Sequence, residues 1–125
     1  MTQLPEKTAE ERLRQKLEAF PADFQELVLA HRAHPSPESL AQIVSGVMAF
    51  HGGDTYTQKF AEKGNDALLV EDLGFDSLTL VEISFHAEEF VGIIIQVEDF
   101  AAIKTLGDLQ GFLRGKLFPD AASAS

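Results

Sequence analysis

The sequence predicts an all-α protein: a bundle of three main helices with a short helix between the last two, and an extra N-terminal helix or helical hairpin. Apolar residues recur three and four positions apart through much of the chain, as on one face of an α-helix, and almost no segment alternates as a strand does. Clear helix-start signals occur at Ser36, Asp76 and Thr105. We therefore expect an N-terminal helical extension, a helical domain and a disordered tail, at residues 1–35, 36–118 and 119–125.

The segment 9–33 carries a narrow apolar seam of near-heptad period, made by Leu13, Leu17, Phe20, Phe24 and Leu27. Pro21 interrupts it, so the segment forms either one kinked helix or two helices meeting at Phe20 and Pro21. Such a seam must be buried. We favour a homodimer through residues 9–33, or a dedicated docking partner, over packing on the chain's own bundle. Residues 92–95 are a candidate acceptor.

The next helix begins with Ser36 as N-cap, followed by proline at the first helical position. We expect it to run to about Phe50 and to bury Leu40, Ile43, Val44 and Val47. Gly52 and Gly53 are expected to end this helix. Residues 54–72 are then predicted to form a long loop, anchored to the bundle by Tyr56, Phe60, Leu68 and Leu69.

A further helix is predicted over residues 77–91, with two apolar stripes. The first stripe contains Leu80, Ser84, Ala87 and Val91, with Ile83 beside it. The second, on the adjacent face, contains Leu78, Val81 and Phe85. The last helix starts after Thr105, whose pairing with Asp108 predicts a capping box. It is expected to bury Leu109, Phe112 and Leu113.

The loop before residue 77 is the most informative part of the chain. An acidic segment is expected to turn at Gly74, which places Ser77 at the start of a helix capped by Asp76. Free backbone N–H groups and the helix dipole favour a phosphate at such a position. A nucleophilic serine would need a base, yet the nearest histidine, His86, lies nine residues along the same helix. That separation places it on the opposite side and more than about 10 Å away, which argues against a serine hydrolase.

Leu73-Gly74-Phe75-Asp76-Ser77-Leu78, followed by Val81-Glu82, resembles the attachment site of acyl carrier proteins. The resemblance extends from about Ser36 to Leu117. It implies that the chain carries acyl groups as thioesters on 4′-phosphopantetheine attached to Ser77. It would deliver them to enzymes of fatty acid, polyketide or related lipid synthesis, without being an enzyme itself. One departure is Gln96, which stands where the family often has proline.

The resemblance also implies a recognition surface at Asp76, Leu78, Val81, Glu82 and Phe85. Its partners would be a phosphopantetheinyl transferase and acyl-processing enzymes with basic docking surfaces. Simple core packing is the alternative interpretation of Val81 and Phe85.

Charge and composition agree with this hypothesis. The net charge is −10, and residues 1–35 hold five Lys/Arg against six Asp/Glu, so residues 36–125 hold five against fourteen. An acidic surface argues against nucleic acid or an anionic membrane as partner and favours basic protein surfaces. The acidic residues cluster around Ser77: Glu71, Asp72, Asp76, Glu82, Glu88 and Glu89.

The sequence has no cysteine, which excludes disulfides and thiolate metal sites. It has no apolar run long enough to span a membrane, and residues 1–16 do not resemble a signal peptide, so we expect a cytoplasmic protein. We expect no metal site, because the four histidines lack ligand spacing and are expected at the surface or half-buried: His31, His34, His51 and His86.

Two other functions remain open. One is an unmodified helical interaction or scaffold module, with the N-terminal extension as its working part. The other is a peptidyl or D-alanyl carrier, which also attaches its arm to a serine before a helix. Asp76 favours the acyl type, because peptidyl carriers more often present a glycine-histidine or similar pair there.

Overall fold

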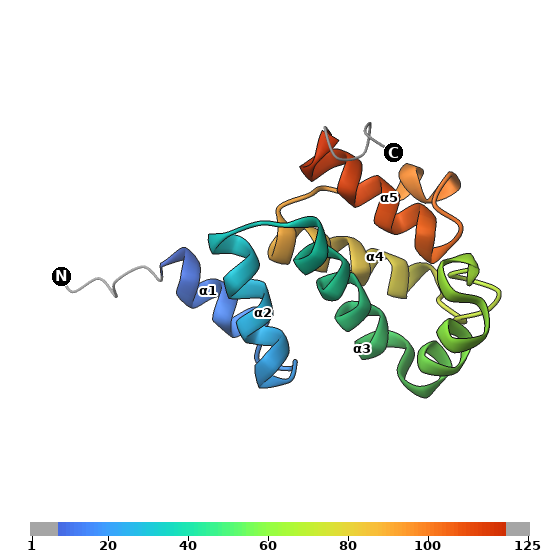
Figure 1. The fold of residues 1–125 in the computed structure, drawn as a ribbon, viewed down its shortest axis with the longest axis horizontal. Coiled ribbons are helices and arrows are strands. Elements are labelled where there is room, and N and C mark those ends of the chain that lie inside the picture. The colour runs from blue at the N-terminus through green and yellow to red at the C-terminus, as the bar shows by residue number, and fades with distance from the viewer. Residues whose placement is uncertain (1–7, 120–125) are drawn as a thin grey trace.

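A computed structural model describes residues 8–119, and the all-α prediction is confirmed for this part of the chain (Figure 1). Its α-helices are α1 (Ala9–Lys16), α2 (Ala22–Ala33), α3 (Pro37–Lys63), α4 (Ser77–His86) and α5 (Leu106–Leu117). Shorter helical turns are η1 (Gly64–Asp66), η2 (Ala87–Val91) and η3 (Val97–Ala101). Within residues 8–119, β-structure is limited to a bridge between Leu68 and Thr105.

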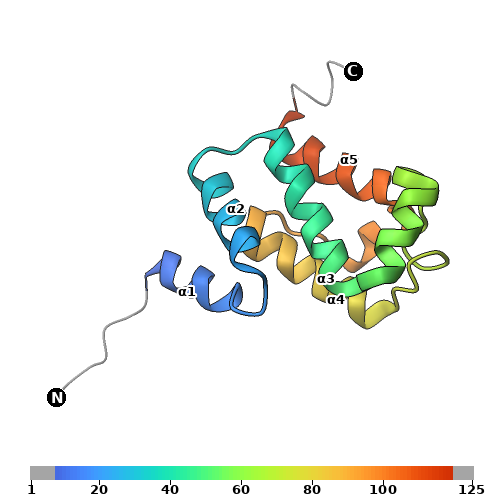
Figure 2. The same cartoon turned by 60° about the horizontal axis from the view of Figure 1, so that its bottom comes forward.

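Helices α3, α4 and α5 form the bundle, and α1 and α2 form a hairpin at its side (Figures 1 and 2). Helix α2 packs against α3 and η2, α1 packs against η2, and α5 packs against α3 and η1. The short η3 lies between α4 and α5 in sequence, as predicted. No helix in residues 8–119 is long and apolar enough to cross a membrane.

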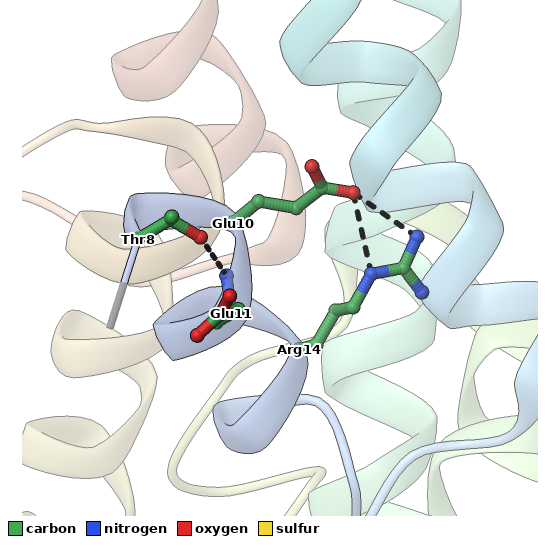
Figure 3. A network of polar contacts seen from close by, with 4 residues as sticks. All are labelled: Thr8, Glu10, Glu11 and Arg14. Carbon is green, nitrogen blue, oxygen red and sulfur yellow. Dashed lines mark hydrogen bonds and ion pairs between the residues drawn. The ribbon is translucent and has the colours of Figure 1, made fainter. Parts of the chain in front are cut away.

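The N-terminal segment forms two helices rather than one kinked helix. Helix α1 begins where the Thr8 hydroxyl accepts a hydrogen bond from the Glu11 backbone N–H at 3.1 Å, and an ion pair at 3.1 Å joins Glu10 to Arg14 one turn on (Figure 3). It ends at Lys16, and Pro21 immediately precedes α2. Proline has no N–H to donate and suits a helix start, so it separates the two helices.

The seam is covered by the chain's own bundle, which corrects the expectation of a homodimer through residues 9–33. Leu17 is fully buried, Leu27 is half-buried, and the other three seam residues are at most 8% exposed. Phe20 stacks on Phe24 and meets Phe90 of η2 edge-on, with ring centroids 4.7 and 5.4 Å apart. The seam therefore helps to bury the core and is not free for a second copy.

Helix α3 starts as predicted but runs further. The Ser36 hydroxyl accepts the Ser39 N–H at 3.0 Å, and the Ser39 hydroxyl accepts the Ser36 N–H at 3.2 Å. Gly53, at φ 55°, breaks the helical path as predicted, but a second helical stretch follows at once over residues 54–63, so the predicted loop over 54–72 is wrong there. Only glycine adopts this conformation readily.

The expected anchors of this region differ in burial. Tyr56 and Leu69 are buried and Leu68 is half-buried, but Phe60 is 41% exposed. Phe60 is therefore not the anchor that was predicted.

The later helix boundaries follow the sequence closely. The helix that starts at Ser77 continues through η2 to Val91 and stops at Gly92, which takes a left-handed conformation. Thr105 and Asp108 form the predicted capping box of α5. Leu109 and Leu113 are buried, while Phe112 is only half-buried. Of the predicted tail 119–125, residues 120–125 lie outside the described residues, as do residues 1–7 of the N-terminal extension.

Candidate functional site

Ser77 is the first residue of α4, and it is exposed. The preceding residue, Asp76, caps the helix: its Oδ1 accepts the backbone N–H of Thr79 at 2.8 Å. This hydrogen bond stabilises the charged carboxylate and lowers the pKa of Asp76 below its usual value. The serine hydroxyl therefore stands at a well-defined helix start beside a carboxylate that stays ionised at neutral pH.

Buried apolar side chains hold the loop that leads to Ser77. Leu69, Leu73 and Phe75 are each at most 4% exposed, so the loop is pinned to the bundle at three points. Gly74 lies between two of them at φ 73°, a conformation that suits glycine. The Phe75 N–H donates to the Leu69 carbonyl at 3.0 Å, closing the loop on itself. These contacts hold the loop, and with it Ser77, in one position.

Polar contacts tie the same loop to two helices. The Leu69 N–H donates to the Lys104 carbonyl at 2.9 Å, just before α5. The Asp72 carboxylate accepts the Leu68 N–H at 2.8 Å and the Lys63 ammonium, at the end of α3, at 2.9 Å. The Leu68 N–H, and then the Lys63 contact, lower the pKa of Asp72, and the hydrogen bond to Asp72 raises the pKa of Lys63.

Sequence reasoning missed this role of Asp72, which it placed with the recognition charges. Glu89 was placed there too, yet it is half-buried and pairs with Lys16 of α1 at 2.7 Å. No local pattern marks either pairing, because Lys16 lies 73 residues from Glu89, and Lys63 is nine residues from Asp72 at the end of a helical stretch that was not predicted. The exposed acidic residues of the predicted cluster are Glu71, Asp76, Glu82 and Glu88.

The predicted recognition residues differ in exposure. Leu78 and Phe85 are 66% and 56% exposed, which excludes core packing for Phe85. Val81 is half-buried and Glu82 is exposed. Together with Asp76 they present apolar and acidic groups on the helix that begins at Ser77.

Within residues 8–119, the Ser77 hydroxyl has no hydrogen-bonding partner. His86 does not approach it, because its ring stacks on Phe90 at 5.1 Å and lies 5.2 Å from the ring of His51. A serine without a base is a poor nucleophile. Its exposure at a fixed helix start instead suits it to accept a group from another protein.

One of the four histidines is more buried than expected. His31 is 3% exposed and its Nδ1 hydrogen-bonds with the Ser39 hydroxyl. The expectation of a surface or half-buried histidine is wrong for His31 alone, because His34 is exposed and His51 and His86 are half-buried. Between residues 8 and 119, no group of three or more His, Asp or Glu side chains is placed to hold a metal ion.

Comparison with known proteins agrees with this geometry. Residues 62–113 match the family described as "Phosphopantetheine attachment site", a stretch that includes the loop, α4, η3 and most of α5. The match covers less than half of the chain. No curated protein and no solved structure matches the sequence.

Proposed function

We propose that the chain is an acyl carrier protein with its 4′-phosphopantetheine on Ser77, because residues 62–113 match the family of phosphopantetheine attachment sites. It carries acyl groups as thioesters and delivers them to enzymes of fatty acid, polyketide or related lipid synthesis. Domains of this family are not themselves catalytic, and we propose that the chain as a whole is not an enzyme.

The choice between two serines supports Ser77 as the attachment site. The matched stretch contains only Ser77 and Ser84. Ser84 is half-buried and its hydroxyl donates to the Val81 carbonyl at 2.6 Å, so its oxygen is turned into its own helix. Ser77 is exposed and its hydroxyl has no partner among the described residues. An enzyme that adds a large group can reach Ser77 without unfolding α4.

The surroundings of Ser77 fit a phosphoester. The first turn of a helix attracts negative charge through its dipole. The Asp76 carboxylate accepts a hydrogen bond from the Thr79 N–H, which stabilises this turn when the serine is modified. The prosthetic group would supply the thiol that forms the thioester, and the chain has no cysteine to compete with it.

The attachment step balances without a catalytic group from this chain. The Ser77 oxygen forms a bond to the phosphorus of coenzyme A that bears the pantetheine. The bond from that phosphorus to the bridging pyrophosphate oxygen breaks, and adenosine 3′,5′-bisphosphate leaves. The serine proton passes to a base on the phosphopantetheinyl transferase. This division of roles agrees with the absence of a base beside Ser77 within residues 8–119.

The exposed face of α4 is the surface that partner enzymes would recognise. Leu78, Phe85 and the half-buried Val81 offer apolar contacts, and Asp76 and Glu82 offer negative charge. We propose that basic docking surfaces of the transferase and of acyl-processing enzymes meet this face. A peptidyl or D-alanyl carrier, and an unmodified scaffold, are the alternatives that the experiment must exclude.

Intact mass after co-expression with a phosphopantetheinyl transferase tests the attachment. The wild type should gain the mass of one phosphopantetheine group, Ser77→Ala should gain nothing, and the control Ser84→Ala should gain as the wild type does. Circular dichroism should show the same helical content in all three. Modification of Ser77→Ala would overturn the assignment, and an unmodified wild type would favour the scaffold alternative.

A further inference from the structure

Two histidine side chains meet where α3, α4 and the N-terminal hairpin come together. His51 lies in α3 and His86 ends α4, and the centroids of their rings are 5.2 Å apart. His51 Nε2 and His86 Nδ1 are buried, and neither nitrogen has a hydrogen-bonding partner within residues 8–119. Nearly all buried polar atoms in folded proteins have such a partner. This cluster is therefore a place where the folded state tolerates an unfavourable arrangement.

Aromatic rings enclose the two histidines. The His86 ring stacks on Phe90 of η2 at 5.1 Å, and Phe20 and Phe50 meet it edge-on at 5.4 and 6.2 Å. Phe50 also meets the His51 ring edge-on, at 5.2 Å. Of these phenyl rings, Phe20 is the one that belongs to the hairpin, and it is 4% exposed. The hairpin therefore closes one side of the cluster with an apolar group.

The charged groups that face the cluster compensate little for added positive charge. On α4, Glu82 has its Oε2 3.9 Å from Nδ1 of His51, but its side chain is 48% exposed. On η2, Glu89 already pairs with Lys16 of the hairpin at 2.7 Å. Helix α5 lines the space beside His86 with leucine side chains.

Protons on these rings destabilise the closed arrangement. A protonated ring must donate from both nitrogens, and the two buried nitrogens have no acceptor within residues 8–119. Positive charges on both rings also repel each other across 5.2 Å. Burial accordingly lowers the pKa of His86 and of His51. Water supplies acceptors and screening, so the protonated pair favours an opening that admits water.

The N-terminal hairpin is the part of the fold that can move away from the cluster. It lies at the side of the bundle (Figure 1), in which α3 contacts both α4 and α5 directly. The hairpin packs on α3 and on η2, where Ala87–Val91 form a π-helical turn. Such turns are rare and interrupt regular α-helical hydrogen bonding. Local opening of a protein often involves one supersecondary unit of this kind.

We propose that His51 and His86 form a pH switch that controls docking of the N-terminal hairpin. At neutral pH both rings are neutral and Phe20 covers them. Below about pH 6.5 they take up protons in an opened form, in which the hairpin has left the bundle and water reaches both rings. Opening also uncovers Phe90 at the end of the helix that begins at Ser77, so acid adds an apolar surface there. The switch goes beyond the proposed function and requires no group on Ser77.

Amide hydrogen exchange of the full-length protein at pH 7.5, 6.5 and 5.5 measures this opening. Comparing each rate with that of an unstructured peptide at the same pH gives a protection factor. The amides of Val28 and Leu29 report on the hairpin, and that of Leu113 reports on α5. The hairpin amides should be less protected than Leu113. Their protection should fall by about 10–100-fold from pH 7.5 to 5.5, because each histidine contributes at most about tenfold per pH unit below 6.5.

Substitutions identify the groups that titrate. His86→Phe keeps an aromatic ring in the cluster and His51→Gln keeps a polar side chain, and each removes one titrating group. In each variant the fall in hairpin protection should be up to about tenfold smaller than in the wild type. His34→Gln is the matched control, because it also removes a histidine but at an exposed position at the end of α2. It should behave as the wild type does.

Three results would overturn the switch. Hairpin protection that stays constant while that of Leu113 falls would show that the histidines gain protons only when the whole protein unfolds. Equal protection of the hairpin and α5 at every pH would show that they open only together. A wild-type fall in His86→Phe and His51→Gln would place the titrating group elsewhere, and His51→Gln decides alone if His86→Phe does not fold.

Discussion

Phe24 of α2 lies directly on Gly46 of α3, so closely that a Cβ at residue 46 would overlap the phenyl ring. This contact fixes how the N-terminal hairpin sits on the bundle. Phe24 in turn stacks on Phe20, which stacks on Phe50 with ring centroids 4.2 Å apart. One glycine therefore permits the aromatic contacts that join the hairpin to α3.

Gly46→Ala should destabilise the fold by about 1–3 kcal/mol, because the added methyl group forces Phe24 out of its place. Urea unfolding followed by circular dichroism measures this change. Gly111→Ala in α5 is the control, since nothing lies within 4 Å of a Cβ there. It should stabilise the protein by about 0.5–1 kcal/mol through helix propensity. Equal stabilisation by both substitutions would show that the hairpin does not pack on α3 as described.

Stability should fall as the pH drops from 7.5 through 6.5 towards 5. Burial lowers the pKa of His86, and neighbouring His51 lowers it further; burial also lowers the pKa of His51, against the opposing effect of Glu82. The folded state therefore binds protons less readily than the unfolded state, whose histidines titrate near 6.5. Each histidine contributes at most about 1.4 kcal/mol per pH unit in this window. His31, whose pKa is also lowered by burial, acts in the same direction.

His86→Phe tests this assignment. The His86 ring stacks on Phe90 and meets Phe20 edge-on at 5.4 Å, so an aromatic ring is compatible with the site. The substitution also removes a buried Nδ1 that lacks a hydrogen-bonding partner. The variant should lose less stability than the wild type between pH 7.5 and 5.5 in urea titrations. An unchanged pH dependence would mean that His86 does not titrate in this range.

Asp72→Ala should loosen the loop that carries Ser77. The Leu68 N–H would lose its acceptor and Lys63 its ion-pair partner. Hydrogen exchange at the Leu68 N–H should become faster. Transfer of phosphopantetheine to Ser77 should become slower, because the loop that positions Ser77 is less rigid. Glu71→Ala removes the exposed neighbouring charge and should leave hydrogen exchange at Leu68 unchanged. Because the pKa of Asp72 is lowered, its contribution is present at neutral pH and is lost only as the pH falls through that lowered pKa.

Glu82→Lys should slow phosphopantetheine transfer and weaken its dependence on salt, because long-range attraction to a basic enzyme surface is lost. Stability should change little, since Glu82 is exposed. Glu26→Lys, at an exposed position of α2, changes the net charge equally and is the control. The recognition role of Glu82 would be excluded if both variants showed the wild-type rate across a salt series.

The sequence by itself determined the helix starts and the attachment motif. Ser36, Asp76 and Thr105 each cap a helix as predicted, with hydrogen bonds to backbone N–H groups three residues on. Such contacts are local, so a few neighbouring residues suffice to specify them. The position of Ser77 at the start of α4 follows from the same local signals.

Tertiary structure decided what the apolar surfaces meet. The seam of α1 and α2 packs on α3 and η2, although its period alone fitted a second copy equally well. Residues 54–63 became helical past Gly53, and their Tyr56 is buried against the bundle. The pairing of Lys16 with Glu89 and the approach of His51 to His86 also join distant parts of the chain, and Asp72 pairs with Lys63 at the end of α3. Apolar burial is not directional, so a pattern shows which face must be covered but not which surface covers it.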